Sequence, residues 1–355
     1  MPRVFVYEFV CGGGWQAVDP EGTPPESLFR EGRAMLTALV ADFAAIPDVE
    51  VVTLRDSRLH ELALEHCDVR EVRSAIEERI AICELAASAD WTIVIAPEFD
   101  RLLFERAHWV EESGGRLLSP SSEIIALCTD KHRTAEHLKA ASVPTPPGVP
   151  LDELSAPPRA FQYPAVLKPR DGAGSQGVRM IRDEAHFREV AREATEQAAA
   201  TAGWRLERYC PGRAASVALL SGPAGCLALP PCSQRLSDDG QFRYLGGTCP
   251  LPKELGERAA ALAQRAVATL PNPIGYVGVD LVLGDDPAGE DDYVIEINPR
   301  LTTSYVGLSA LAKSNLAAAM LSVVNGHMPR LEFLFGRVEF DASGEVYTQE
   351  HKLTM

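Results

Sequence analysis

Positive charge is scarce in this sequence. Its 355 residues include 34 Lys and Arg against 50 Asp and Glu, which gives a formal net charge of −16. Nucleic acids and anionic membranes bind basic surfaces, so we expect neither as a partner. No segment resembles a signal peptide, and no apolar run is long enough to span a bilayer. We therefore expect a cytoplasmic protein.

Cysteine and histidine patterns typical of metal or disulfide sites are absent as well. The eight cysteines contain no Cys-x-x-Cys pair, which argues against zinc fingers and against a disulfide framework. The eight histidines have no ligand spacing. There is neither an internal repeat nor a low-complexity linker. A chain of this length can bury a substantial core, divided over two or three subdomains.

Strands and helices are expected to alternate along the N-terminal part of the chain. The hydrophobic pattern predicts strands at 3–10, 49–54 and 91–96 and helices at 27–45 and 72–89. This alternation predicts a parallel sheet with helices on both faces. Ligands bind at the carboxyl ends of such strands, so the candidate substrate contacts here are Glu8, Gly12, Gly13, Gly14 and Glu98. The three glycines are equally explained as a plain turn.

The segment Val294–Arg300 is the most informative one. It begins as an apolar strand and then presents a carboxylate, an amide oxygen and a guanidinium within five residues. Because side chains alternate along a strand, Glu296 and Asn298 point the same way, and Arg300 follows once Pro299 has ended the pairing. This set suits Mg²⁺ and phosphate. The alternative is a strand end whose polar residues merely reach solvent.

Asp280 strengthens the metal interpretation. It is the one acidic residue in the predicted strand Gly275–Leu283, where a carboxylate is costly to bury unless it is paired or binds a metal. The acidic, turn-rich segment 284–292 joins this strand to the next, so we expect an antiparallel pair in which Asp280 faces Glu296. Two facing carboxylates repel each other unless a cation lies between them.

A lysine and a glycine-rich loop form a second candidate site. A short apolar strand delivers Lys168, and the loop behind it contains Gly172, Gly174 and Gly177. Backbone amides of such loops approach anions closely. Unlike in a Walker A loop, the lysine precedes the glycines; unlike in a Rossmann fingerprint, a returning strand at 178–181 follows them. We expect a hairpin lid over phosphates, with an ordinary turn as the alternative.

Two weaker signals complete the set. A strand over Arg205–Arg208, a Pro-Gly turn and a strand over Ala215–Leu220 form a crevice that suits an adenine base, although an ordinary hairpin explains the pattern too. Lys131 lies at the start of a helix that runs to residue 141, where the helix dipole disfavours a cation. A bound anion accounts for this position, as does plain exposure to solvent.

Taken in chain order, these elements resemble the ATP-grasp superfamily over roughly residues 120–330. The resemblance implies α/β and α+β parts, the ATP-grasp fold, with ATP held between two subdomains. It also implies that the phosphates are bound by Lys131 and Lys168 and by a loop of Gly172, Ala173, Gly174, Ser175 and Gly177. The implied adenine contacts are Glu207, Arg208, Tyr209 and Cys210. The implied ligands of Mg²⁺ (or Mn²⁺) are Asp280, Glu296 and Asn298, and Arg300 would contact the transferred phosphoryl group. Arg300 and Lys168 are the implied catalytic residues.

One position departs from the family pattern. Many ATP-grasp ligases carry a ribose-binding glutamate shortly after the Pro-Gly turn, where this chain has Ala214 or Ala215. Ribose recognition must then come from elsewhere. The expected division is an N-terminal parallel-sheet (pre-ATP-grasp) domain at 1–118, a small ATP-grasp subdomain at 119–190, a large subdomain with the metal site at 191–330, and a tail at 331–355.

Two longer segments, 4–14 and 295–308, resemble the branch of this superfamily that contains tyramine–glutamate ligases of methanofuran biosynthesis. This implies an amide bond between a carboxylate, the glutamate side chain, and tyramine or a related amine, formed through an acyl phosphate in one-carbon cofactor biosynthesis. Thr302 and Thr303 are candidate contacts of the substrate carboxylate or helix caps, Ser304 is expected to cap the next helix, and Arg235 is a candidate cation for an acidic substrate.

Several alternatives stay open. The chain is either such a ligase, a nucleotide-binding regulator that does not ligate, or an ATP-grasp enzyme of other chemistry, a carboxylase or a phosphoryl transferase. A homodimer is a further open expectation. Outside the motifs, we expect helices at 184–201, 259–270 and 308–325, and a charged tail at 337–355 that is an edge strand or disordered. The stretch 230–252, with Gln234 and Tyr244, is expected to be irregular and either shapes the acceptor pocket or is a plain surface loop.

Overall fold

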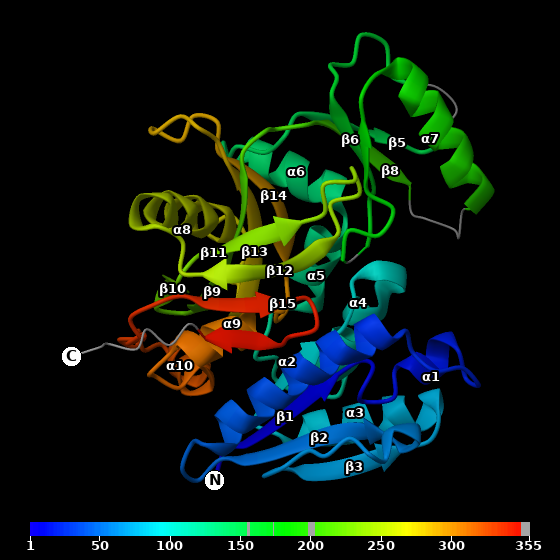
Figure 1. The fold of residues 1–355 in the computed structure, drawn as a ribbon. Helices are drawn as coiled ribbons and strands as arrows, with labels where there is room; N and C mark the ends of the chain where they lie inside the picture. The colour runs from blue at the N-terminus through cyan, green and yellow to red at the C-terminus, as the bar shows by residue number, and fades with distance from the viewer. Residues whose placement is uncertain (155–156, 173, 198–202, 349–355) are drawn as a thin grey trace.

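Three β-sheets organise the chain (Figure 1). The computed structural model describes residues 1–154, 157–172, 174–197 and 203–348. Among the helices of these ranges, none has both the length and the apolar character that crossing a membrane requires. Ala173 and residues 198–202 and 349–355 lie outside the described part, so the expectations placed on them stay predictions.

The first sheet confirms the predicted parallel arrangement. It consists of β1 (Arg3–Glu8), β2 (Glu50–Asp56), β3 (Asp68–Val72) and β4 (Trp91–Ile95), all parallel in the order β3-β2-β1-β4. Short helices α1 (Trp15–Val18), η1 (Ser57–Leu59) and η2 (Phe99–Arg101) lie in its connections. Strand β3 was not predicted, because Asp68-Val69-Arg70-Glu71-Val72 is charged and lies at the sheet edge, so its side chains give no run of apolar residues.

Helices cover both faces of this sheet because the strand side chains alternate. Val4 and Val6 pack with helix α2 (Glu26–Ala44). Phe5 and Tyr7 pack on the opposite face with α3 (Ala75–Ser88) and α4 (Leu102–Glu112). Figure 1 shows α2 running between this sheet and the helices α9 and α10, so one hydrophobic cluster joins the N-terminal sheet to the C-terminal part.

The second sheet is antiparallel. It contains β5 (Gly148–Leu151), β6 (Ala165–Pro169), β7 (Arg179–Ile181) and β8 (Trp204–Arg208) in the order β5-β8-β6-β7. Helix α7 (Glu184–Gln197) covers it, and α5 (Ser122–Thr129) and α6 (Lys131–Ala140) precede it. Since β8 pairs with β5 and β6, this sheet extends beyond residue 190, where the sequence placed a subdomain boundary. Strand β7 confirms the returning strand after the glycine loop.

The third sheet is the largest. Its strands are β9 (Arg213–Gly222), β10 (Gly225–Ala228), β11 (Cys232–Leu236), β12 (Tyr244–Cys249), β13 (Gly275–Leu283), β14 (Tyr293–Asn298), β15 (Val338–Asp341) and β16 (Val346–Thr348). They follow the order β14-β13-β9-β11-β12-β15-β16, with β10 paired to β9. Helix α8 (Lys253–Val267) packs on one face, and α9 (Ser304–Leu311) and α10 (Leu316–Val324) pack on the other.

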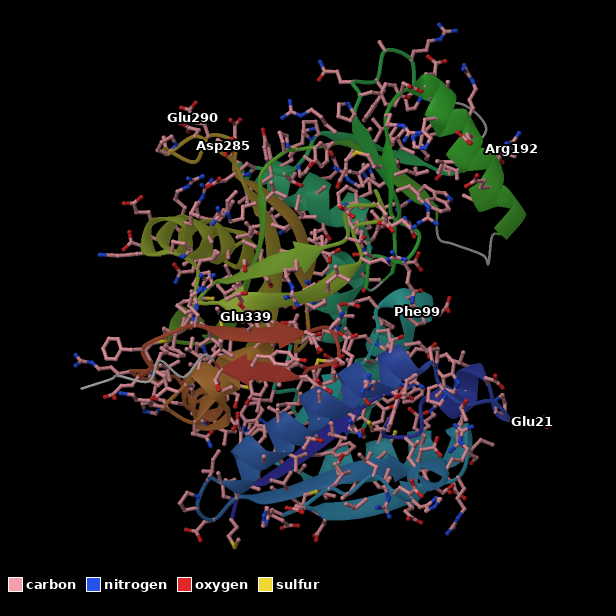
Figure 2. The ribbon with its side chains drawn as sticks, in the orientation of Figure 1. Glu21, Phe99, Arg192, Asp285, Glu290 and Glu339 are labelled. Carbon is pink, nitrogen blue, oxygen red and sulfur yellow. The ribbon has the colours of Figure 1, made fainter. Side chains whose placement is uncertain are left out.

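Two predictions in this region are wrong and one is confirmed. The stretch 230–252 is not irregular, because β11 and β12 form a ladder within it. The helix expected at 308–325 is two helices; Asn315 ends the continuity by accepting a hydrogen bond from the Ala318 backbone as the cap of α10. The described part of the tail does add strands to the sheet: β15 pairs with β12, and β16 pairs with β15 as the edge strand. Figure 2 shows Asp285 and Glu290 on the loop between β13 and β14, away from the body of the molecule.

Candidate active site

A pocket lies where the second sheet, the third sheet and helix α2 meet. Its walls come from segments far apart in the sequence, because each sheet offers one face to it. The residues singled out from the sequence that line it are Lys131, Lys168, Gly172, Gly174, Ser175, Glu207, Arg208, Tyr209, Cys210, Asp280, Glu296, Asn298, Arg300, Thr302 and Thr303. Gly177 lies in the same loop, its φ of +73° demanding glycine.

Two facing carboxylates occupy one wall. Asp280 of β13 lies directly opposite Glu296 of β14 in the antiparallel ladder, which confirms the expected pair. Asn298 donates its amide hydrogen to Asp280 Oδ2 at 3.1 Å, and Gln234 donates to Asp280 Oδ1 at 3.0 Å. Burial and the neighbouring Glu296 raise the pKa of Asp280 to about 7. Although burial raises the pKa of Glu296, Lys131 and Lys168 bring it below its ordinary value.

These residues fit a divalent cation. The nearest protein cation is Lys131, whose Nζ lies 3.5 Å from Glu296 Oε2, and it faces one carboxylate of the pair only. Across the described residues, no group of three or more His, Cys, Asp and Glu side chains could hold a metal by itself. Two carboxylates and one amide oxygen are a donor set that Mg²⁺ completes with phosphate and water.

The glycine loop closes over the other side of the pocket. Lys131, at the start of α6, donates from Nζ to the Gly172 carbonyl at 2.8 Å and so ties the loop to that helix. Gly172 and Gly174 have φ values of +135° and +64°, with open space where a side chain would lie. Glycine is therefore needed there for its backbone conformation and not for packing.

Lys168 is held by a buried charge network. Its Nζ lies 2.5 Å from Glu207 Oε1, while Glu207 Oε2 accepts a hydrogen bond from Arg205 Nε at 2.7 Å. The Glu207 carboxylate is thus engaged by two protein cations. Beyond it, the Tyr209 ring stacks with Phe242 at 6.2 Å between ring centroids. Ala214 lines the pocket, whereas Ala215 is buried in the core, so Ala214 occupies the position next to the expected nucleotide.

Arg300 is fixed from the N-terminal sheet. Its Nε and Nη2 donate to the two carboxylate oxygens of Glu98 at 2.8 and 3.0 Å, although the residues are 202 positions apart. Glu98 follows β4 at the carboxyl end of the parallel sheet, the edge where the sequence placed it. It holds the guanidinium at the pocket and is not itself a lining residue.

The segment after Arg300 differs from expectation in one detail. Helix α9 begins at Ser304 with Thr303 at the N-cap position, and no side-chain cap hydrogen bond forms. Ser304 is therefore not the cap; its hydroxyl hydrogen-bonds with Thr302 Oγ1 at 2.9 Å, and Thr302 Oγ1 also bonds with the Tyr276 hydroxyl at 2.9 Å. The Ser304 hydroxyl is thus used in hydrogen bonds with side chains and does not cap the helix backbone.

Other candidates from the sequence are not brought to the pocket. Glu8 is buried under α2, its carboxylate accepts a hydrogen bond from the Cys11 backbone at 2.7 Å, and burial raises its pKa to about 7. The turn glycines Gly12, Gly13 and Gly14 pack tightly, since a Cβ at Gly14 would lie 2.3 Å from the Phe9 ring. Arg235 is exposed on the other side of β11 and donates to the Leu245 carbonyl at 3.0 Å.

Several lining residues were missed by the sequence reasoning. They are Glu31 of α2, Ser216 of β9 and Phe242. Gln234 of β11 and Tyr244 also line the pocket, and both belong to the stretch 230–252 that the sequence offered as part of the acceptor pocket or as a plain surface loop. Gln234 was within reach, because two-residue alternation in 232–236 places it on the opposite face from Arg235. Glu31 had no local signal, since it is one of several charged residues in a surface helix.

Known proteins resemble the chain along most of its length. The pre ATP-grasp 3 domain family matches residues 49–125, and the ATP-grasp domain family matches residues 128–304. The tyramine–L-glutamate ligase of Methanocaldococcus jannaschii is 24% identical over 332 residues, 93% of this chain and 91% of that protein. A biotin carboxylase of Pseudomonas aeruginosa is 34% identical over 103 residues, 27% of this chain and 23% of that protein.

A solved structure shares the whole architecture. A protein assigned to the ATP-grasp superfamily from Archaeoglobus fulgidus superposes with a TM-score of 0.70 at 23% identity, over 96% of this chain and 92% of its own. The four-stranded parallel sheet, the two family matches and this superposition agree with the geometry of the pocket. The chain therefore belongs to the ATP-grasp superfamily, with a pre-ATP-grasp domain followed by an ATP-grasp domain.

Proposed function

We propose that the protein is an ADP-forming ligase that joins a carboxylate to an amine at the expense of ATP. The observation that carries this proposal is the in-register pair of Asp280 and Glu296, with Lys131, Lys168 and the buttressed Arg300 on the same pocket. The narrower identity, glutamate reacting through its side chain with tyramine or a related amine in one-carbon cofactor biosynthesis, is supported by the resemblance to the tyramine–L-glutamate ligase over 93% of the chain.

Each charged group has a distinct part in the proposed reaction. Lys131 and Lys168 bind the phosphates, and the backbone amides of the glycine loop lie over them. Magnesium, held by Asp280, Glu296 and Asn298, would neutralise phosphate charge. The guanidinium of Arg300, oriented by Glu98, stabilises charge on the phosphoryl group during transfer.

The atoms balance in two steps. A carboxylate oxygen of the substrate attacks the γ-phosphorus of ATP, the bond to the bridging oxygen breaks, and ADP leaves. The amine nitrogen then attacks the acyl carbon, loses a proton and expels inorganic phosphate, which leaves an amide. No protein nucleophile takes part, so the protein contributes binding, orientation and charge neutralisation.

A carboxylase is the second candidate. The biotin carboxylase of Pseudomonas aeruginosa is more identical, at 34%, but only along 27% of this chain. A nucleotide-binding regulator is disfavoured because Asp280, Glu296, Asn298 and Arg300, the groups assigned to metal binding and phosphoryl transfer, all line the pocket. The three functions differ in what they consume: only a ligase uses up an amine, and a carboxylase requires bicarbonate.

The test is ADP release with magnesium, glutamate and a panel of amines that includes tyramine, with mass spectrometry of the products. We expect ADP only when both partners are present, together with an amide. Lys168→Met should remove this activity, and Lys253→Met, at an exposed lysine of α8, is the matched control that keeps it. ADP formation that needs bicarbonate and no amine would replace the ligase with the carboxylase.

A further inference from the structure

One carboxylate in the pocket has no part in the reaction described above. Glu31 projects from helix α2 of the N-terminal domain and lines the pocket beside Thr302 and Thr303. Glu31 is also within electrostatic reach of Tyr244. Burial raises the pKa of the Tyr244 phenol most, and nearby ionisable groups that include Glu31 raise it further.

Most of the other charged side chains that line the pocket already have partners of opposite charge. Arg205 and Lys168 engage Glu207, Lys131 lies beside Glu296, and Glu98 takes both hydrogen bonds of the Arg300 guanidinium that face it. Asp280 and Glu296 form the proposed metal site. In the described ranges, three lining carboxylates have no ion pair: Asp280 of the proposed metal site, Asp171 of the glycine loop beside Arg170, and Glu31.

Glu31 is also oriented. Thr303, only 5% exposed, donates its hydroxyl hydrogen to Glu31 Oε1 at 2.5 Å. The same threonine precedes helix α9, which packs against α2, so both ends of this hydrogen bond rest on fixed helices. The nearby Arg300 guanidinium is already paired with Glu98, and Glu31 makes no ion pair with a described residue. A positioned carboxylate of this kind that faces a pocket is complementary to a cationic ligand group.

We propose that Glu31, oriented by Thr303, binds a primary ammonium group of a substrate. The assignment rests on the proposed ligase function and adds to it the subsite that recognises the positive charge. Two groups in the proposed reaction have this chemistry, the α-ammonium of an amino-acid substrate and the ammonium form of the acceptor amine. The experiment separates these two sources.

The direct test compares ligands that differ only in the ammonium group. Calorimetric titrations, with ADP and magnesium present, measure glutamate against glutarate and tyramine against its alcohol analogue, 2-(4-hydroxyphenyl)ethanol. For one of these pairs, the protein should bind the ammonium ligand about 10- to 100-fold more tightly, as expected for a hydrogen bond between charged groups. The pair that shows the preference names the source.

The variant Glu31→Gln should abolish that preference, while the amide oxygen still accepts the Thr303 hydrogen bond and keeps the fold. Glu26→Gln is the matched control, an exposed glutamate at the start of the same helix that loses the same charge outside the pocket. In turnover, Glu31→Gln should raise KM for the ammonium substrate and leave KM for ATP unchanged.

Two results overturn the assignment. One is that the protein shows no preference for the ammonium ligand in either pair; the other is that Glu31→Gln retains the preference. The ligase function fails separately, if no amide forms with any partner. An amide formed equally well by Glu31→Gln refutes the role of Glu31 and leaves the ligase standing.

Discussion

Replacing Glu98 by glutamine tests whether the N-terminal domain supplies a working part of the active site. The carboxylate of Glu98 holds Arg300 through two hydrogen bonds of 2.8 and 3.0 Å. Glutamine has nearly the same shape, but it offers one acceptor where glutamate offers two and carries no charge. The guanidinium is then left half-paired in a site with little water.

The structure sets the size of the effect. The two side chains are only 13% and 6% exposed, so the pair belongs with buried ion pairs, for which loss of one partner costs about 3–5 kcal/mol. Because glutamine retains one hydrogen bond, we expect the free energy of unfolding to fall by about 2–3 kcal/mol. A misplaced guanidinium should lower kcat about 10- to 100-fold, since small errors of position in a charge-stabilising group have effects of this size.

The assay combines urea denaturation with steady-state kinetics. Glu98→Gln should lower kcat while KM for ATP stays within about twofold, since the proposed phosphate contacts are the lysines and the glycine loop and do not include Arg300 in the ground state. The control is Glu257→Gln, which breaks an exposed pair with Lys253, 68% and 87% exposed, and should change stability by less than about 0.5 kcal/mol. Unchanged kcat in Glu98→Gln, despite lost stability, would refute the positioning of Arg300 and reduce Glu98 to a purely structural role.

Three further predictions concern other parts of the molecule. Lys168→Met should abolish turnover and weaken ATP binding at least about tenfold, as measured by nucleotide titration, while Arg205 still neutralises Glu207 and preserves the fold. The pKa of Glu8 is raised to about 7 from an ordinary 4.5, so between these pH values the folded protein holds a proton that the unfolded chain releases. The free energy of unfolding should therefore fall by up to about 3 kcal/mol as pH rises from 4.5 to 7. Urea denaturation of Glu8→Gln should show a flatter pH dependence than the unsubstituted protein, and equal slopes would contradict a buried, protonated carboxyl at Glu8. Gln234→Leu removes a hydrogen bond to Asp280, and the magnesium concentration for half-maximal activity should rise several-fold, or the orienting role of Gln234 is wrong.

Local periodicity was enough to predict the elements that carry long apolar patterns. Strands β1 and β4 bury most of their side chains and helix α2 buries one apolar face, and the alternation of strands with helices led directly to the parallel sheet. The hydrophobic pattern did not predict strands that are short or that bury only one face. Strand β3 is charged at the sheet edge, and β11 and β12 mix polar residues with glycines because one of their faces borders the pocket.

The candidate site likewise has one part that the sequence predicted and one part that it did not. Residues of the nucleotide half occur in contiguous segments whose order is informative, so Asp280, Glu296 and Lys168 could be placed from the sequence alone. The other half is assembled by tertiary packing. Glu31 reaches the pocket only because α2 packs against α9, and the pair of Glu98 with Arg300 spans 202 positions. Sequence spacing holds no information on contacts of this kind.

The pairing of β13 with β14 makes the site sensitive to a one-residue shift within either strand, but tolerant of changes in the length of the loop that joins them. Asp280 and Glu296 share a face because they are paired directly in a ladder that runs residue for residue from Gly278 to Asp280 and shifts register between Asp280 and Leu281. Deletion of Ile297 would therefore put Glu296 and Asn298 on opposite sides of the sheet. The loop that joins the strands has no such constraint, and its tip, marked by Asp285 and Glu290, extends away from the body of the molecule (Figure 2). A fluorescent label or a whole inserted domain between these two residues should therefore leave the two carboxylates facing each other, which makes this loop the natural attachment point for a reporter of the working enzyme.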